Sequence, residues 1–322
     1  MDTQRIIAEA TLGPSFPLPY DLPFTTAQAK AAGISTRTLT LLTKEGILRR
    51  PIKSVYVATD LGDSLRLRAD CLRLVTPEDA VIVDRHAGWL HGATMVLRPN
   101  EHLELRPVSM FLPSGRGRLR NGLAASGERN FGPGDVVELH GLQVTSPLRT
   151  AWDLGRVRWT DEAIAALDAM LRLEVFTLEE LLAGIERFRG MRWVTTLRAI
   201  APLADGRAES PGESVLRLRC VEARLKGMVP QVEVYRGETL VARLDLADVA
   251  IMLAAEYDGA EWHTSPEQRE HDRQRRKEAE KLGWLVKPFT KEHVFGRTRE
   301  CDRMLHEAAR EARARRGLRV LW

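Results

Sequence analysis

The last third of the chain alternates short apolar runs with charged stretches. Two apolar runs, Val241–Leu246 and Ala250–Tyr257, predict strands that a turn near residues 248–250 joins into a hairpin. The charged stretch Pro266–Leu282 predicts a helix with a basic face, and Trp284–Phe289 predicts a third strand. Thr290 is typical of a residue that caps a last helix. The order strand, strand, helix, strand, helix indicates a small layered α/β domain.

A different pattern fills the first sixty residues. Thr25–Ala32 predicts a short helix, and Ser35 is expected to cap a second one. The apolar positions of the second helix are Leu39, Leu41 and Leu42. Two short strands are expected at Ile47–Arg50 and Ser54–Ala58. Helix, turn, helix and hairpin in this order indicate a winged helix.

A winged helix places its second helix in the major groove of double-stranded DNA and its wing against phosphates. Residues 35–54 contain five basic side chains and one acidic side chain, which suits that partner. The expected groove contacts include Arg37, Thr38 and Lys44, and the expected wing contacts are Arg49, Arg50 and Lys53. Winged helices also bind proteins, so a protein partner stays an alternative.

The middle of the chain predicts a further α/β region. Residues 81–95 indicate a strand that enters a helix, with two histidines expected to serve in the core or in caps. Residues 113–134 predict an exposed loop, residues 144–154 a strand that leads into a helix, and residues 161–200 helices. The predicted class is therefore multidomain α/β (α+β), with domains at 1–60, 61–203 and 204–322.

Composition places limits on the class of protein. The 322 residues allow two or three domains, and no segment approaches a membrane span or a signal peptide. Three widely separated cysteines fit a reducing cytoplasm and no zinc cluster. Arginine far outnumbers lysine, 40 to 8, which suits phosphate contacts, although genomic base composition explains such a bias equally well.

Three acids stand at the ends of the predicted hairpin strands. Side chains alternate along a strand, so Glu256 and Asp258 point the same way, and the hairpin brings Asp245 close to Glu256. Buried carboxylates raise one another's pKa, and a divalent cation such as Mg²⁺ or Mn²⁺ removes that cost. Such a site hydrolyses phosphodiester bonds. The alternative is an exposed strand end followed by an ordinary Asp-Gly turn.

Basic residues and a histidine follow the acids. His263 suits a general base or a group that holds a water or the scissile phosphate, and a surface histidine is its alternative. Arg273 and Arg276 on the predicted helix suit a phosphate clamp.

The segment Glu209–Val294 resembles the very-short-patch-repair-type endonuclease domain of the PD-(D/E)XK, restriction-endonuclease-like superfamily. The motifs that carry the resemblance are Glu209-Ser210-Pro211-Gly212-Glu213, Pro230-Gln231, Asp245, Glu256-Tyr257-Asp258-Gly259, Trp262-His263, Asp272-Arg273 and Gly283-Trp284. The resemblance implies that Asp245, Glu256 and Glu213 hold the metal. Asp258 stands where the superfamily has lysine, and His263 would replace that lysine. A capping box at Ser210 explains Glu213 equally well.

The winged-helix stretch and the region around 144–154 resemble AbiEi-type antitoxins, which implies DNA binding and leaves open a toxin or other protein partner. The preferred hypothesis is a cytoplasmic, metal-dependent DNA endonuclease of defence or repair. The alternative is an antitoxin-like, DNA-binding transcriptional regulator whose nuclease-like domain has no catalytic activity. RNA as the substrate and the oligomeric state are left open.

Overall fold

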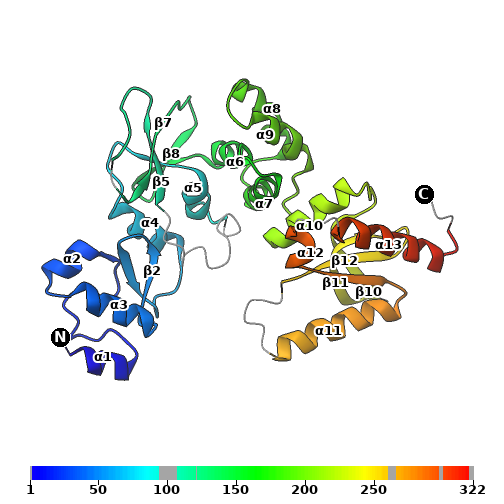
Figure 1. Ribbon diagram of the computed structural model, residues 1–322, viewed down its shortest axis with the longest axis horizontal. Coiled ribbons are helices and arrows are strands. Elements are labelled where there is room, and N and C mark those ends of the chain that lie inside the picture. Colours follow the sequence, from blue (N-terminus) through cyan, green and yellow to red (C-terminus); the bar gives the residue numbers. More distant parts are fainter. Residues whose placement is uncertain (1, 94–106, 121, 260–265, 297–299, 319–322) are drawn as a thin grey trace. The chain divides into compact units, whose positions relative to one another are not determined.

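The structure is a computed structural model that describes residues 2–93, 107–120, 122–259, 266–296 and 300–318 (Figure 1). Helices and sheets are mixed throughout, which confirms the predicted fold class. The chain divides into two compact units, residues 1–154 (unit 1) and 155–322 (unit 2). None of the helices in the described ranges is long and apolar enough to cross a membrane.

Unit 1 begins with the winged helix. Its elements are α1 (Thr3–Glu9), β1 (Phe24–Thr25), α2 (Thr26–Ala31), α3 (Thr36–Lys44), β2 (Leu48–Ile52) and β3 (Val55–Ala58). Ser35 caps α3, as predicted, and Thr25 forms a capping box at the start of α2. The strands form a three-stranded sheet in the order β1-β3-β2.

The rest of unit 1 is a sheet with the order β6-β5-β4-β9-β8, to which β7 is added beside β5. Its strands are β4 (Val81–Ile82), β5 (Val108–Pro113), β6 (Ala124–Ala125), β7 (Glu128–Arg129), β8 (Val136–Leu139) and β9 (Leu142–Thr145). The helices are α4 (Leu65–Arg73), α5 (Asp84–Leu90) and α6 (Pro147–Gly155). The two predicted core or cap histidines are confirmed. His86 Nδ1 accepts the Ser109 N–H at 3.0 Å, and His91 Nε2 contacts the Thr145 carbonyl at 2.7 Å.

Unit 2 starts with four helices, the last of which packs against the sheet that follows. They are α7 (Thr160–Leu171), α8 (Leu178–Ala183), α9 (Val194–Ile200) and α10 (Pro211–Glu222), with short 3-10 turns at Ile185–Phe188 and Ala201–Leu203. Arg217 of α10 donates to Asp168 of α7 at 2.6 and 2.8 Å, and both side chains are buried. These contacts join residues on both sides of 203/204 within unit 2, and the three predicted domains stay a prediction.

The sheet of unit 2 has the order β10-β11-β12-β13, formed by Val229–Arg236, Thr239–Asp248, Leu253–Asp258 and Leu285–Thr290. β11 and β12 are antiparallel, and β12 and β13 are parallel. Helix α11 (Pro266–Lys281) covers one face, and α10 and α13 (Glu300–Arg315) cover the other, while α12 (Lys291–Phe295) follows β13 (Figure 1).

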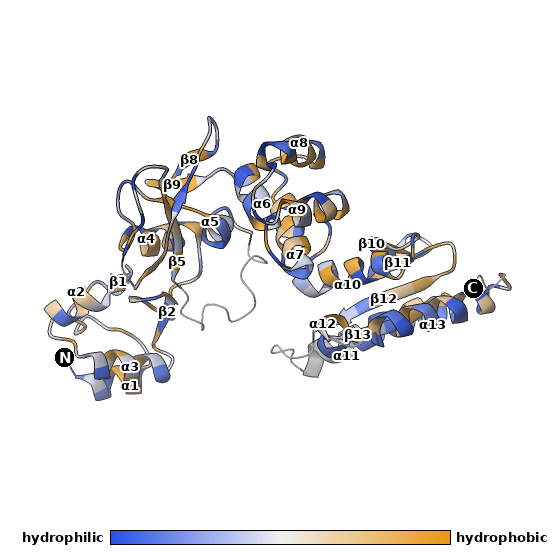
Figure 2. Ribbon diagram, turned by 45° about the horizontal axis from the view of Figure 1, so that its top comes forward, coloured by the Kyte–Doolittle hydropathy of each residue, from blue (hydrophilic) through white to orange (hydrophobic). Residues whose placement is uncertain are grey.

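The predicted order strand, strand, helix, strand, helix is confirmed from β11 to α12, while β10 precedes it and α13 follows it. The second strand starts at Leu253 instead of Ala250, because Met252 adopts a left-handed φ of 53° and residues 249–252 form the turn. β12 begins apolar and ends in Glu256, Tyr257 and Asp258, and Figure 2 shows this change of hydropathy along the arrow. The chemistry of unit 2 therefore gathers at the carboxyl end of β12.

Candidate functional site

The first candidate site is an acidic cluster formed by Asp245 of β11, Glu256 of β12 and Glu213 of α10. Leu246 pairs with Ala255 across the β11–β12 ladder, so Asp245 lies opposite Glu256 at the next position. The backbone N–H of Tyr257 donates to Asp245 Oδ2 at 3.0 Å. The predicted proximity of Asp245 and Glu256 is therefore confirmed.

Glu213 joins this cluster from the first turn of α10. Ser210 accepts the Glu213 N–H at 3.1 Å, and Pro211 occupies the first turn, so the predicted helix start is confirmed. The Glu213 carboxylate accepts the Glu209 N–H at 2.8 Å and the Gln231 side-chain amide at 2.9 Å. Burial raises the pKa of Glu213.

Gln231 lies beside the cluster, although the sequence analysis gave it no role in the site. It lies between Pro230 and Val232, which pair with Leu246 and Leu244, so it faces Asp245 across the β10–β11 ladder. Its φ of 56° is unusual for a residue that is not glycine. The Pro-Gln pair before a strand carried part of the resemblance, but only the fold shows that this glutamine contacts Glu213.

The electrostatics of the cluster centre on Asp245. Burial, and after it the charges of Glu213 and Glu256, raise the pKa of Asp245 to about 7. The hydrogen bond from Tyr257 N–H and the positive charge of Arg275 oppose that rise. An ionised Asp245 is therefore costly near neutral pH unless a cation lies beside it.

The basic side chains of α11 contact the acids. Arg276 Nε donates to Glu256 Oε2 at 3.2 Å, so this predicted phosphate clamp binds a cluster carboxylate in the structure. Arg273 is exposed, and Asp258 is half-buried at the end of β12. The predicted general base His263 lies outside the described residues. The roles of these four residues in catalysis or DNA binding stay predictions.

Asp245 and Glu256 have the donor chemistry for Mg²⁺, which takes one or two carboxylates together with water and phosphate oxygens. Burial is the main cause of the raised pKa of Asp245, and the negative charges of Glu213 and Glu256 add to it; a divalent cation would offset both. A fuller ligand set does not appear in the described ranges, where no three His, Cys, Asp or Glu side chains are placed to hold a metal. The geometry thus fits a two-carboxylate site more closely than one that includes Glu213.

The second candidate site is the exposed face of α3. Arg37, Thr40 and Lys44 recur at helical spacing and are exposed. Within the described ranges, the guanidinium of Arg37 and the ammonium of Lys44 form no hydrogen bond or ion pair with another side chain. Thr38 instead bonds to the Ser35 hydroxyl at 2.9 Å and supports the cap. Of the three apolar positions of this helix, Leu39 and Leu42 fill the core, whereas Leu41 is 38% exposed.

The predicted wing residues make contacts within the protein. Arg49 donates to the Leu61 carbonyl at 3.0 Å, and Lys53 donates to the Gly122 carbonyl at 2.8 Å. The guanidinium of Arg50 lies 5.1 Å from the centre of the Tyr56 ring. These contacts position the wing, and its contact with phosphates stays a prediction.

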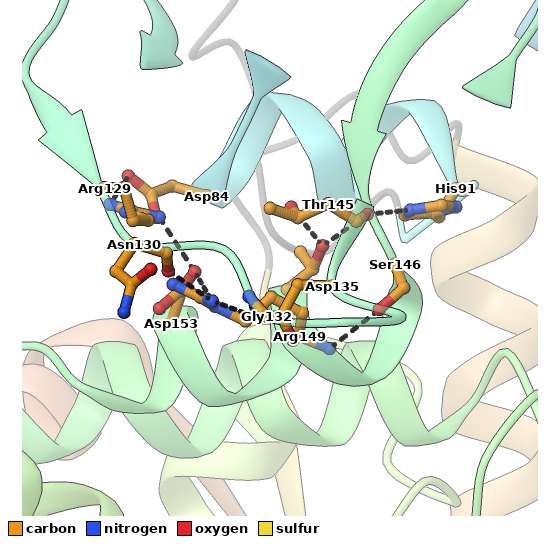
Figure 3. Close-up of polar contacts among 11 residues, drawn as sticks. Asp84, His91, Arg129, Asn130, Gly132, Asp135, Thr145, Ser146, Arg149 and Asp153 are labelled. Atoms are coloured by element: carbon orange, nitrogen blue, oxygen red, sulfur yellow. Dashed lines mark hydrogen bonds and ion pairs between the residues drawn. The ribbon is translucent and has the colours of Figure 1, made fainter. Parts of the chain in front are cut away.

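A buried ion-pair network in unit 1 was also missed from the sequence (Figure 3). Arg149 of α6 binds Asp135 at 2.5 Å and Asp153 at 2.8 Å, and all three side chains are at most 5% exposed. Arg129 bridges Asp153 and Asp84 at 2.8 and 2.7 Å. The only feature of the local sequence that indicated this network was the four-residue spacing of Arg149 and Asp153 on a predicted helix. The network fastens residues 128–135 to α6 and α5.

Comparison with known proteins identifies two parts of the chain. Residues 23–59 match the family model described as a transcriptional regulator, AbiEi antitoxin, and residues 80–203 match the AbiEi antitoxin C-terminal domain. Neither match extends into residues 204–322, where a nuclease domain was predicted.

Two curated relatives are uncharacterised proteins of Mycobacterium tuberculosis, one from strain CDC 1551 / Oshkosh and one from strain ATCC 25618 / H37Rv. Each is 34% identical to this chain over 175 residues, which cover 54% of this chain and 64% of the relative. The chain therefore spans less than two thirds of the length of these relatives. The winged helix at its start and most of the region that follows are therefore similar to the two AbiEi antitoxin family models.

Proposed function

We propose that this protein is a DNA-binding transcriptional regulator of the AbiEi antitoxin type, which reads double-stranded DNA with α3. The observation that carries the proposal is the exposed face of α3, where Arg37 and Lys44 flank Thr40. The two family matches support the same function. A toxin is the expected protein partner, because the matched families are described as antitoxins.

The packing of α3 determines which of its faces meets solvent. Leu39 and Leu42 are fully buried and fix the rotation of the helix, so the opposite face presents Arg37 and Lys44 to solvent. Because neither cation bonds to a described side chain, phosphate or base contact requires no internal ion pair to break. Arginine binds phosphates and guanine edges with two parallel hydrogen bonds.

The test compares duplex binding by two double variants of the full-length protein. In Arg37→Ala/Lys44→Ala, we expect weaker binding to a short mixed-sequence duplex and a fall of about 2 in the slope of log K against log salt, because each lost phosphate contact removes roughly 0.9. The matched control is Arg5→Ala/Lys30→Ala, which removes the same charge from α1 and α2. An unchanged salt slope in the α3 variant would assign this face to a protein partner.

A second candidate function rests on the acidic cluster. The raised pKa of Asp245 beside Glu256 supports a metal-dependent endonuclease that hydrolyses phosphodiester bonds. Asp245 and Glu256 would hold Mg²⁺ or Mn²⁺, and the bound ion would polarise a phosphate and lower the pKa of a water. Arg276 fixes the orientation of Glu256, and Gln231 fixes that of Glu213. Asp258, in place of a lysine, favours the regulator.

Plasmid cleavage with Mg²⁺ or Mn²⁺ tests this second function. A nuclease should nick or cut the plasmid, and Asp245→Ala should abolish the cleavage while duplex binding through α3 persists. Glu280→Ala, which removes an exposed carboxylate from α11, is the matched control. Equal cleavage by the Asp245 variant would exclude the acidic cluster as the active site.

A further inference from the structure

Two segments of unit 2, residues 155–159 and 185–198, lie against each other. The guanidinium of Arg156, from the first segment, lies 4.7 Å from the centre of the Phe188 ring in the second. A β-carbon at Gly155 would lie 2.5 Å from a methyl carbon of Leu197, so the segments are also in close contact at the core. We call five exposed or half-exposed side chains of these adjoining segments the arginine–tryptophan surface: Arg158, Trp159, Arg189, Arg192 and Trp193.

Positive charge is concentrated in these two segments. The two segments contain six arginines and one acidic residue, a net charge of +5 in 19 residues, whereas the whole chain carries +4. That single acid, Glu186, pairs with Arg198 at 2.8 Å. The guanidinium groups of Arg158, Arg189 and Arg192 have no hydrogen bond or ion pair within the ranges that the structure describes.

Two of these arginines lie over tryptophans. The guanidinium of Arg158 is 4.5 Å from the centre of the Trp159 ring, and that of Arg192 is 5.0 Å from the centre of the Trp193 ring. Trp159 is 56% exposed, which is unusual for so large an apolar side chain. Trp193 has a left-handed φ of 63°, a strained conformation for a bulky residue. Each pair thus places an aromatic face beside a cation that is free to bind an anion.

We propose that the arginine–tryptophan surface binds single-stranded nucleic acid. Unpaired arginines contact successive phosphates, and indoles stack on bases, which is the combination that sequence-tolerant single-strand binding uses. A duplex keeps its bases stacked inside, so it has no base to offer Trp159. An acidic protein would match the charge, but it lacks the repeated flat rings that fit exposed indoles. This surface lies in unit 2, whereas α3 lies in unit 1, so the proposal does not depend on the winged helix.

The test measures binding of fluorescein-labelled oligothymidine to the full-length protein by anisotropy. In Arg158→Ala/Arg189→Ala/Arg192→Ala, we expect Kd to rise about tenfold or more and the salt slope to fall by about 2, because a single strand releases roughly 0.7 counterion per neutralised phosphate. The matched control, Arg303→Ala/Arg310→Ala/Arg315→Ala on α13, removes the same charge from another exposed face of unit 2 and should bind as the wild type does.

A second readout isolates the stacking. Oligothymidine should quench the tryptophan fluorescence of the wild type, and Trp159→Phe should remove most of that quenching. Equal weakening in the α13 control would reduce the effect to net charge and overturn the proposal. Loss of binding in Arg37→Ala/Lys44→Ala alone would place the single strand on α3 and also overturn it. Tighter binding of polyglutamate than of oligothymidine would favour an acidic protein partner and exclude single-stranded nucleic acid as the ligand.

Discussion

Replacing Asp245 with asparagine should stabilise unit 2 in a way that depends on pH. The pKa of Asp245 rises from 3.8 to about 7 in the folded chain, first through burial and then through Glu213 and Glu256. An unfolded Asp245 loses its proton near pH 4, whereas the folded one keeps it to about pH 7. The folded state therefore binds more protons across this window, so stability falls as pH rises from 4 to 7 and then levels off.

The size of this loss of stability follows from the shift in the pKa of Asp245. Each tenfold change in proton affinity corresponds to about 1.4 kcal/mol, so an ionised Asp245 costs the folded state about 4 kcal/mol at pH 8. Between pH 5 and pH 8 the wild type should lose about 3 kcal/mol that Asp245→Asn does not lose. For a unit of this size, that difference corresponds to roughly 6–12 °C in Tm.

Calorimetric melting of both proteins across this pH range is the assay, with Glu280→Gln as the control for the loss of one charge. Millimolar Mg²⁺ or Mn²⁺ at pH 8 should raise the Tm of the wild type and leave that of Asp245→Asn unchanged, because a cation that binds the folded state stabilises it. A Tm difference between variant and wild type that is constant from pH 5 to pH 8 would refute the electrostatic reasoning. A normal pH response without a metal response would refute only the metal site.

Two further predictions concern unit 1. Arg149→Ala should destabilise unit 1 by about 3–5 kcal/mol in urea unfolding, because it leaves Asp135 and Asp153 buried with fewer partners; a loss below 1 kcal/mol would show that the network contributes little. Leu39→Ala should reduce the free energy of unfolding of the winged helix by about 2–5 kcal/mol, measured by thermal melting, whereas Leu41→Ala should change it little. Equal effects of the two leucine variants would contradict the orientation of α3.

The elements that the sequence predicted well have strong local signals. Thr25, Ser35 and Ser210 each cap the helix that was expected, because a side-chain oxygen needs only the next few backbone N–H groups. The apolar runs at β11 and β12 also fix their own hairpin register, since a slip by one residue would expose the core face. That register is what brings Asp245 beside Glu256.

Ion pairs between segments that are far apart in the sequence could not be predicted from the local sequence pattern. Arg149 reaches Asp135 across 14 residues, and Arg217 reaches Asp168 across 49. Their charge suggested solvent or phosphate, yet folding buries each arginine against a carboxylate. Leu41 shows the opposite case, because three leucines in four residues cannot all face one core. Burial of a given side chain thus depends on which helix face the rest of the unit covers.

The acidic cluster also has a basic partner that comes from a distant part of the chain, Arg276 of α11. Within β12 alone, Asp258 stands where the superfamily signature has a lysine. The strand by itself therefore suggests that Asp245 and Glu256 have no positively charged neighbour. The fold supplies that cation from α11, where Arg276 binds Glu256 from twenty residues further along the chain. Arg275, its neighbour, lowers the pKa of Asp245 from the same helix. The absence of lysine from the strand therefore says little about the charge balance at the cluster. The response of Asp245 to pH and to Mg²⁺ is the measurement that decides whether this charge balance leaves room for a metal ion.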